Sequence, residues 1–129
     1  MIINSNVNLQ SYSYWRVGGN ARYLITVNSK EEILSAVNFI KSKKLPVIVI
    51  GNTSNLLFSD KGVNGGLIKL GPSFDNIDVD DGGMKVSAGV FVPSMVRKAV
   101  NNGFTGLEHL VGVPASLGGA ISMNAGSQR

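Results

Sequence analysis

The sequence predicts an α+β protein in which helices and strands are mixed along one chain of 129 residues. Two observations carry this prediction. In the first half, a capped amphipathic helix lies between two short segments rich in β-forming residues, 23–27 and 47–50. In the second half, a pair of alternating segments precedes one more helix. The pattern changes near residue 71, so two lobes are expected.

The first half predicts a β-α-β unit. Residues 1–20 are polar and read as irregular, and residues 23–27 read as a strand. Ser29 and Glu32 stand at the N-cap and N3 positions of a capping box. The helix that follows carries its apolar residues at helical spacing: Ile33, Leu34, Ala36, Val37 and Ile40.

Residues 47–50 form a continuous apolar run, which is typical of a strand covered on both faces. A first glycine-rich turn, Gly51-Asn52-Thr53-Ser54-Asn55-Leu56-Leu57, follows directly. It therefore lies at the carboxyl end of a strand, where open α/β sheets bind their ligands.

The second half predicts a strand, a hairpin and a helix. Residues 66–70 read as a strand, and residues 77–79 and 84–88 flank an Asp-Asp-Gly-Gly turn. Pro93 opens the helix and Gly103 stands at its C′ position. A loop then leads to a second glycine-rich turn.

These elements predict a first lobe over residues 1–70 and a second over residues 71–129. The second lobe has only a hairpin and one helix before the glycine-rich turn that ends near Arg129. We therefore expect this lobe to be truncated.

Composition excludes several classes of protein. The net charge of +4 is spread along the chain without a basic stripe, which argues against nucleic-acid binding. No run of eighteen apolar residues predicts a membrane span, and the N-terminus has no secretory signal pattern. There is no cysteine. These features fit a cytoplasmic protein.

The first turn combines glycine with small hydroxyl and amide side chains, so its N–H groups can approach an anion closely. Gly51 can adopt a positive φ. An ordinary strand-to-loop turn explains the same residues, and both interpretations stay open. The turn is neither a Walker A loop nor a dinucleotide G-x-G-x-x-G fingerprint.

The second turn runs from Gly112 to Ala120 and continues to Asn124-Ala125-Gly126. Ser116 is expected to cap a short helix from Leu117, which would aim N–H groups outward. Close packing of backbone on backbone is the alternative. Two such turns in one short chain suggest a ligand with a diphosphate, held from two sides, but they do not separate flavin from nicotinamide.

No catalytic residue emerges from the pattern. Glu108 and His109 adjoin each other, but a lone histidine is more often structural, and no metal-ligand spacing is present. An aromatic cluster, Tyr12, Tyr14 and Trp15, could cover a flat ring system or simply pin the N-terminus to the core.

Four ordered motifs resemble those of the UDP-N-acetylenolpyruvoylglucosamine reductase family. Trp15 to Arg22 is similar to its "T-x-R-I-G-G-x-A-R", and Gly51 to Leu57 to its "G-x-G-S-N-L-L". Gly103 to Glu108 resembles "G-x-x-G-L-E", and Val111 to Gly126 resembles "x-G-I-P-G-x-V-G-G-A-x-x-M-N-A-G". Together they cover nearly the whole chain.

The resemblance implies an FAD-binding fold of the vanillyl-alcohol-oxidase (PCMH) type and a flavoenzyme of peptidoglycan precursor synthesis. The family uses NADPH and FAD to reduce a UDP-N-acetylglucosamine enolpyruvyl ether to UDP-N-acetylmuramate. By this resemblance, two sets of residues are expected to contact FAD. They are Gly51, Asn52, Thr53, Ser54, Asn55 and Leu56 in the first turn, and Pro114, Ala115, Ser116, Gly118, Gly119, Asn124, Ala125 and Gly126 in the second.

The chain departs from the family pattern at several positions. Thr53 and Ala115 replace glycines, and a β-branched residue resists positive φ, so the first turn is expected to be re-formed or weakened. Ser13-Tyr14 replaces the family's "N-T". Ser127-Gln128-Arg129 replaces a small-Tyr-Gly step, and Arg129 is not interpreted as the family's catalytic arginine. The catalytic residues and the substrate domain are expected to be absent, so no catalytic residue is assigned.

Three interpretations follow. The chain is the FAD-binding part of an active reductase, with a UDP-sugar substrate once it is completed. Alternatively, it is a stand-alone FAD-binding or interaction module without reductase activity, in which a homodimer covers the exposed edge. A flavoprotein subunit completed by a partner chain is the third.

Overall fold

A computed structural model describes residues 1–126 and divides the chain into two compact units, Met1–Ser73 and Phe74–Arg129. The expected lobe boundary lay after residue 70. Each unit is described by itself.

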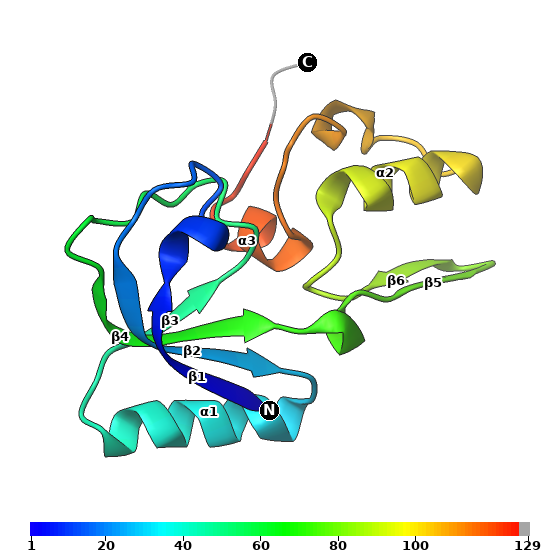
Figure 1. The fold of residues 1–129 in the computed structure, drawn as a ribbon. Helices are drawn as coiled ribbons and strands as arrows, with labels where there is room; N and C mark the ends of the chain where they lie inside the picture. Colours follow the sequence, from blue (N-terminus) through cyan, green and yellow to red (C-terminus); the bar gives the residue numbers. More distant parts are fainter. Residues whose placement is uncertain (127–129) are drawn as a thin grey trace. The chain divides into compact units, whose positions relative to one another are not determined.

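Unit 1 is a four-stranded sheet with one helix packed on it (Figure 1). The strand order is β1-β2-β4-β3, where β1 is Ile2–Asn8, β2 is Asn20–Val27, β3 is Val47–Ile50 and β4 is Val63–Leu70. Strands β2, β4 and β3 are parallel, and β1 pairs antiparallel with β2. The β2-α1-β3 unit is confirmed, and β4 lies between its two strands.

Strand β1 corrects the expectation that residues 1–20 are irregular. It pairs with β2 over most of its length, with Ile3 opposite Ile25 and Val7 opposite Ala21. All but one of its residues are exposed, so it lacks the alternation of a half-buried strand. A short 3₁₀ helix, η1 (Leu9–Ser11), follows it.

Helix α1, Lys30–Ser42, covers one face of the sheet. Ser29 caps it as predicted and accepts a hydrogen bond from the Glu32 N–H at 3.2 Å. The Glu32 carboxylate accepts from the Asn28 N–H at 2.7 Å, one residue before the position of an ideal capping box. Leu34 does not join the buried face, since 67% of it is exposed.

Close approach between α1 and the sheet depends on one glycine. A Cβ atom at Gly66 of β4 would lie 2.3 Å from Cγ1 of Ile40 in α1. Because side chains alternate along a strand, Ile68 faces α1 as well, whereas Leu67 faces the opposite side. Any larger residue at position 66 would push the helix away.

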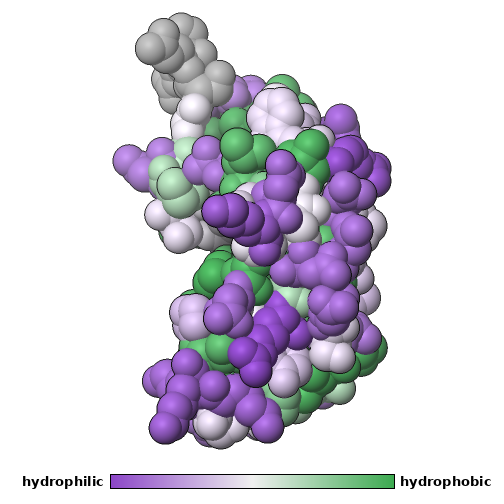
Figure 2. All heavy atoms as spheres, turned by 60° about the vertical axis from the view of Figure 1, so that its left-hand side comes forward, coloured by the Kyte–Doolittle hydropathy of each residue, from purple (hydrophilic) through white to green (hydrophobic). Residues whose placement is uncertain are grey.

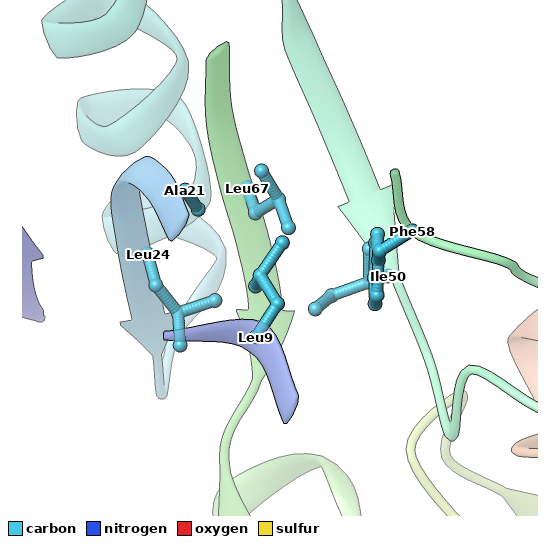
Figure 3. Packing of buried hydrophobic residues seen from close by; sticks show 6 residues of the cluster. All are labelled: Leu9, Ala21, Leu24, Ile50, Phe58 and Leu67. Carbon is cyan, nitrogen blue, oxygen red and sulfur yellow. The ribbon is translucent and has the colours of Figure 1, made fainter. Parts of the chain in front are cut away.

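The opposite face of the sheet carries the core of unit 1. Six side chains from the strands, η1 and the loop before β4 point toward one another (Figure 3): Leu9, Ala21, Leu24, Ile50, Phe58 and Leu67. The expectation that residues 47–50 are covered on both faces is wrong for Val49, which is 68% exposed. The reason is that β3 is an edge strand.

Unit 2 holds the predicted hairpin and helix. Strands β5 (Ile77–Asp80) and β6 (Gly83–Val86) pair antiparallel. Helix α2 spans Val92–Asn101, with proline in its first turn, and Gly103 follows it with a φ of +79°. A 3₁₀ helix η3 (Glu108–Leu110) and a six-residue helix α3 (Leu117–Ser122) complete it.

The core of unit 2 is a separate cluster formed around α2: Val90, Val92, Met95 and Val96.

On the face of the molecule in Figure 2, hydrophilic side chains predominate and hydrophobic ones form small separate groups. Among the described residues, no helix is long and apolar enough to cross a membrane.

Candidate functional site

The first glycine-rich turn, Gly51–Leu57, begins where β3 ends. The carboxyl ends of three parallel strands lie at this edge of the sheet. This is the edge at which open α/β sheets bind ligands. The predicted position of the turn is therefore confirmed.

Several N–H groups of this turn are free to bind a ligand. Within residues 1–126, no protein group accepts a hydrogen bond from the N–H of Asn52, Ser54 or Asn55. The Leu56 N–H is used, because it donates to the Thr53 carbonyl at 3.1 Å. Successive free N–H groups beside a left-handed residue form a concave arrangement that suits an anion.

The left-handed residue of this turn is Thr53, whose φ is +57°. Gly51, for which a positive φ is possible, does not adopt one. A β-branched residue was expected to resist this conformation, with the turn re-formed or weakened as a result, but Thr53 itself adopts it. Thr53 is only 5% exposed, so its surroundings hold it in place.

Two hydrogen bonds explain how Thr53 keeps this conformation. Its hydroxyl donates to the carbonyl of Tyr12 at 2.9 Å, and it accepts from the N–H of Tyr14 at 2.9 Å. These partners lie 41 and 39 residues away in the sequence. The N-terminal loop and the first turn are thus held together by one side chain.

The second turn contains the short helix that was predicted. Ser116 is the N-cap of α3, and its hydroxyl accepts from the Gly119 N–H at 3.4 Å. Ser116 is buried. The segment before it forms an isolated antiparallel bridge between Ser116 and Phe91.

The N–H groups at the start of α3 do not point outward, which corrects our expectation. The Leu117 N–H donates to the Val90 carbonyl at 2.8 Å, and the Gly118 N–H donates to the Ala88 carbonyl at 2.8 Å. A Cβ atom at Gly118 would lie 3.1 Å from Cβ of Ala88. Close backbone packing, the alternative interpretation, therefore explains Gly118.

The other second-turn residues differ in exposure. Pro114, Ala115 and Gly119 are half-buried, whereas Asn124, Ala125 and Gly126 are exposed. Asn124 adopts a φ of +47°. Ser127, Gln128 and Arg129 lie outside the described residues. Of the second-turn residues assigned to the ligand, only Ser116 is buried, and the others keep accessible surface.

Glu108 and His109, which adjoin each other in the sequence, lie in one short element. His109 lies in η3, and the Glu108 carboxylate accepts from the Gly106 N–H at 2.7 Å. No group of three or more His, Asp or Glu side chains within residues 1–126 is placed to hold a metal ion.

A shallow polar hollow of about 440 Å³ lies in unit 1, away from the first turn. Asn6, Arg22 and Lys61 contribute to its lining, and Nη1 of Arg22 donates to Oδ1 of Asn64 at 3.3 Å. None of the lining residues belongs to either glycine-rich turn.

The N-terminal loop adds one feature that the sequence did not reveal, at Ser13, and shows how two members of the predicted aromatic cluster lie. The Ser13 side chain is 4% exposed, and its hydroxyl has no hydrogen-bond partner among the described residues. The rings of Tyr14 and Trp15 meet edge to face with centroids 5.6 Å apart, and both residues are more than half exposed. Both features adjoin the backbone groups that Thr53 binds.

Comparison with known proteins places this geometry in context. Residues 21–129 match the FAD binding domain family. UDP-N-acetylenolpyruvoylglucosamine reductase 1 of Corynebacterium glutamicum is 38% identical over 125 residues, which cover 97% of this chain and 37% of that protein. The reductase of Staphylococcus aureus is 38% identical over 119 residues, or 92% of this chain and 38% of that protein.

The crystal structure of UDP-N-acetylenolpyruvylglucosamine reductase from Thermus caldophilus matches with a TM-score of 0.80 at 38% identity. The match covers 98% of this chain and 44% of that one. The predicted FAD-binding fold and the resemblance drawn from the four motifs are confirmed. The chain spans about two fifths of the length of the curated relatives it matches.

Proposed function

Because this chain belongs to the FAD-binding domain family, with FAD as its cofactor, we propose that its first glycine-rich turn holds the FAD diphosphate. The observation that carries the proposal is the set of free N–H groups at Asn52, Ser54 and Asn55. They follow a parallel strand at the edge of the sheet where ligands bind. Thr53, left-handed and buried between them, fixes the direction of the turn.

The chain's own groups bind and orient the cofactor. The N–H groups of the first turn donate to phosphate oxygens, and the side chains of Ser54 and Asn55 add donors. Gly51 and Leu56 border the turn. In the second turn, we assign FAD contact to eight residues, of which the last three are exposed: Pro114, Ala115, Ser116, Gly118, Gly119, Asn124, Ala125 and Gly126. Bound FAD supplies hydride transfer.

The relatives point to the wider role. We propose that this chain is the FAD-binding part of a reductase that converts UDP-N-acetylglucosamine enolpyruvate to UDP-N-acetylmuramate with NADPH. The substrate is then a UDP-sugar, and the setting is peptidoglycan precursor synthesis and cell shape in the cytoplasm. A homodimer that covers exposed apolar side chains such as Ile121 belongs to the alternative, a stand-alone module without reductase activity.

The first test is the visible absorption spectrum of the purified chain, before and after FAD is added and the sample is desalted. We expect flavin absorbance to stay with the protein. A colourless protein that cannot be reloaded would overturn the proposed cofactor site.

A charge substitution tests the position of the diphosphate. We expect Asn55→Asp to weaken FAD binding roughly tenfold or more, because a carboxylate beside the phosphates adds like-charge repulsion. Asn38→Asp, an exposed position on α1, is the matched control and should leave binding unchanged. Titration of flavin fluorescence measures both. Equal affinities of the two variants would place the diphosphate elsewhere.

A further inference from the structure

Thr53 stands where the reductase motif has glycine, yet it keeps a left-handed backbone with a φ of +57°. Glycine reaches this conformation without strain, whereas threonine does not. A residue that only had to make the turn would therefore be glycine. Threonine offers something glycine lacks, which is a hydroxyl that spans two backbone groups of the N-terminal loop.

This hydroxyl fixes a short loop on both sides of Ser13. It donates to the carbonyl of Tyr12 and accepts from the N–H of Tyr14, each at 2.9 Å. Tyr12 also packs against the core of unit 1, and its ring lies 5.5 Å from Nζ of Lys69. The loop is thus anchored before Tyr14, and the chain then turns at Arg16, whose φ is +59°.

The anchored loop presents an aromatic surface. Tyr14 is 52% exposed and Trp15 is 59% exposed, and their rings are perpendicular to within a few degrees, at 83°. Two large rings held in solvent beside a phosphate-binding turn suit stacking on a planar ring. FAD carries two planar rings, one on each side of its diphosphate.

We propose that Thr53 is a positioning residue that holds the Tyr14–Trp15 pair against a planar ring of FAD bound at the first turn. The inference rests on the proposed function. It concerns a side chain outside the family's glycine pattern. The hydroxyl couples the turn to the pair, so loss of the hydroxyl alters both cofactor affinity and the mobility of Trp15.

The chain contains a single tryptophan, so Trp15 reports on this loop alone. In the cofactor-free chain, we expect Thr53→Val to lower the fluorescence anisotropy of Trp15, because valine keeps the shape but loses both hydrogen bonds. We expect FAD to quench Trp15 in the natural chain and to bind Thr53→Val roughly tenfold more weakly. Thr53→Ser, which keeps the hydroxyl, should restore both values.

A second variant tests the inference without a substitution at position 53, where a change could disturb folding. Tyr14→Ala removes an exposed ring but leaves the backbone N–H that donates a hydrogen bond to the Thr53 hydroxyl. We expect it to weaken FAD binding by about fivefold, whereas Leu34→Ala, at an apolar residue on α1 that is more exposed than Tyr14, should have no effect. Quenching of Trp15 by ADP rather than FMN would assign the adenine ring, and the reverse would assign the flavin ring.

The outcomes separate the two proposals. If the natural chain binds no FAD, the proposed function and this inference both fall. If it binds FAD, but Thr53→Val or Tyr14→Ala leaves affinity and Trp15 quenching unchanged, only this inference falls.

Discussion

Among the described residues, the Ser13 hydroxyl is a buried polar group without a hydrogen-bond partner. Only 4% of the residue is exposed. A buried polar group without a partner costs free energy of folding, typically about 1–3 kcal/mol. In the cofactor-free chain this position is therefore not optimised for stability.

We expect Ser13→Ala to raise the free energy of unfolding of the cofactor-free chain by about 1 kcal/mol, because alanine removes the unpaired hydroxyl. Thermal unfolding measures the change as a rise of roughly 4 °C or more in melting temperature. Ser11→Ala is the control, since the Ser11 hydroxyl is exposed and donates to the Asn8 carbonyl at 3.3 Å. A lower melting temperature for Ser13→Ala would mean that the hydroxyl has a partner in solution.

At the scale of elements, the start of α1 depends on one carboxylate. Glu32 accepts from the Asn28 N–H and forms an ion pair with the ammonium group of Met1. The ammonium group first, and the Asn28 N–H second, lower the pKa of Glu32 below its ordinary value of 4.5. This carboxylate ties Met1, the residue before β1, to the helix that covers the sheet.

The sign of the pH effect follows from that shift. A carboxyl group whose pKa is lower in the folded state stabilises the fold above its unfolded pKa, and this contribution is lost as the pH falls through the folded value. We expect Glu32→Gln to unfold more easily at neutral pH and to show a shallower loss of stability below about pH 4.5. Urea unfolding across that range measures both. Asp60→Asn is the control, and parallel pH curves for Glu32→Gln and the natural chain would contradict the assignment.

The elements also show how far the sequence can predict the fold. Capping residues, apolar periodicity and the Asp-Asp-Gly-Gly turn are local signals, so α1, α2 and the β5–β6 hairpin were predicted correctly. Strand β1 was missed because it forms by pairing with β2 (Figure 1), and almost none of its side chains is buried. Val49 was judged buried because the sequence does not reveal that β4 lies between β2 and β3.

The same limit applies to the candidate site. The position of the first turn followed from the apolar run before it, which is local information. The partners of Thr53 lie about forty residues away, and no pattern in the sequence links them. The occupied N–H groups of α3 also depend on distant carbonyls, those of Ala88 and Val90. Sequence motifs therefore located both turns, whereas tertiary contacts decide which N–H groups are free.

At the scale of the whole molecule, the two units carry different spectroscopic signals. The single tryptophan and the three tyrosines, Tyr12, Tyr14 and Tyr23, all belong to unit 1. Each unit has its own hydrophobic cluster. Trp15 fluorescence therefore follows unfolding of unit 1, while far-ultraviolet circular dichroism follows the helices of both units.

This difference allows a test of which unit provides most of the FAD affinity. A ligand at one hundred times its dissociation constant stabilises the folded state by about 2.7 kcal/mol. For a unit of this size, that corresponds to a rise of roughly 10 °C or more in melting temperature. Since the free N–H groups lie in the first turn and those of α3 are occupied, we expect FAD to shift the Trp15 transition more than the remaining circular dichroism transition. We expect Thr53→Val to reduce the shift of the Trp15 transition and Leu34→Ala to retain it. A ligand stabilises the part of the chain that binds it. If FAD instead shifts the circular dichroism transition of unit 2 more than the Trp15 transition, the main cofactor contacts lie in unit 2.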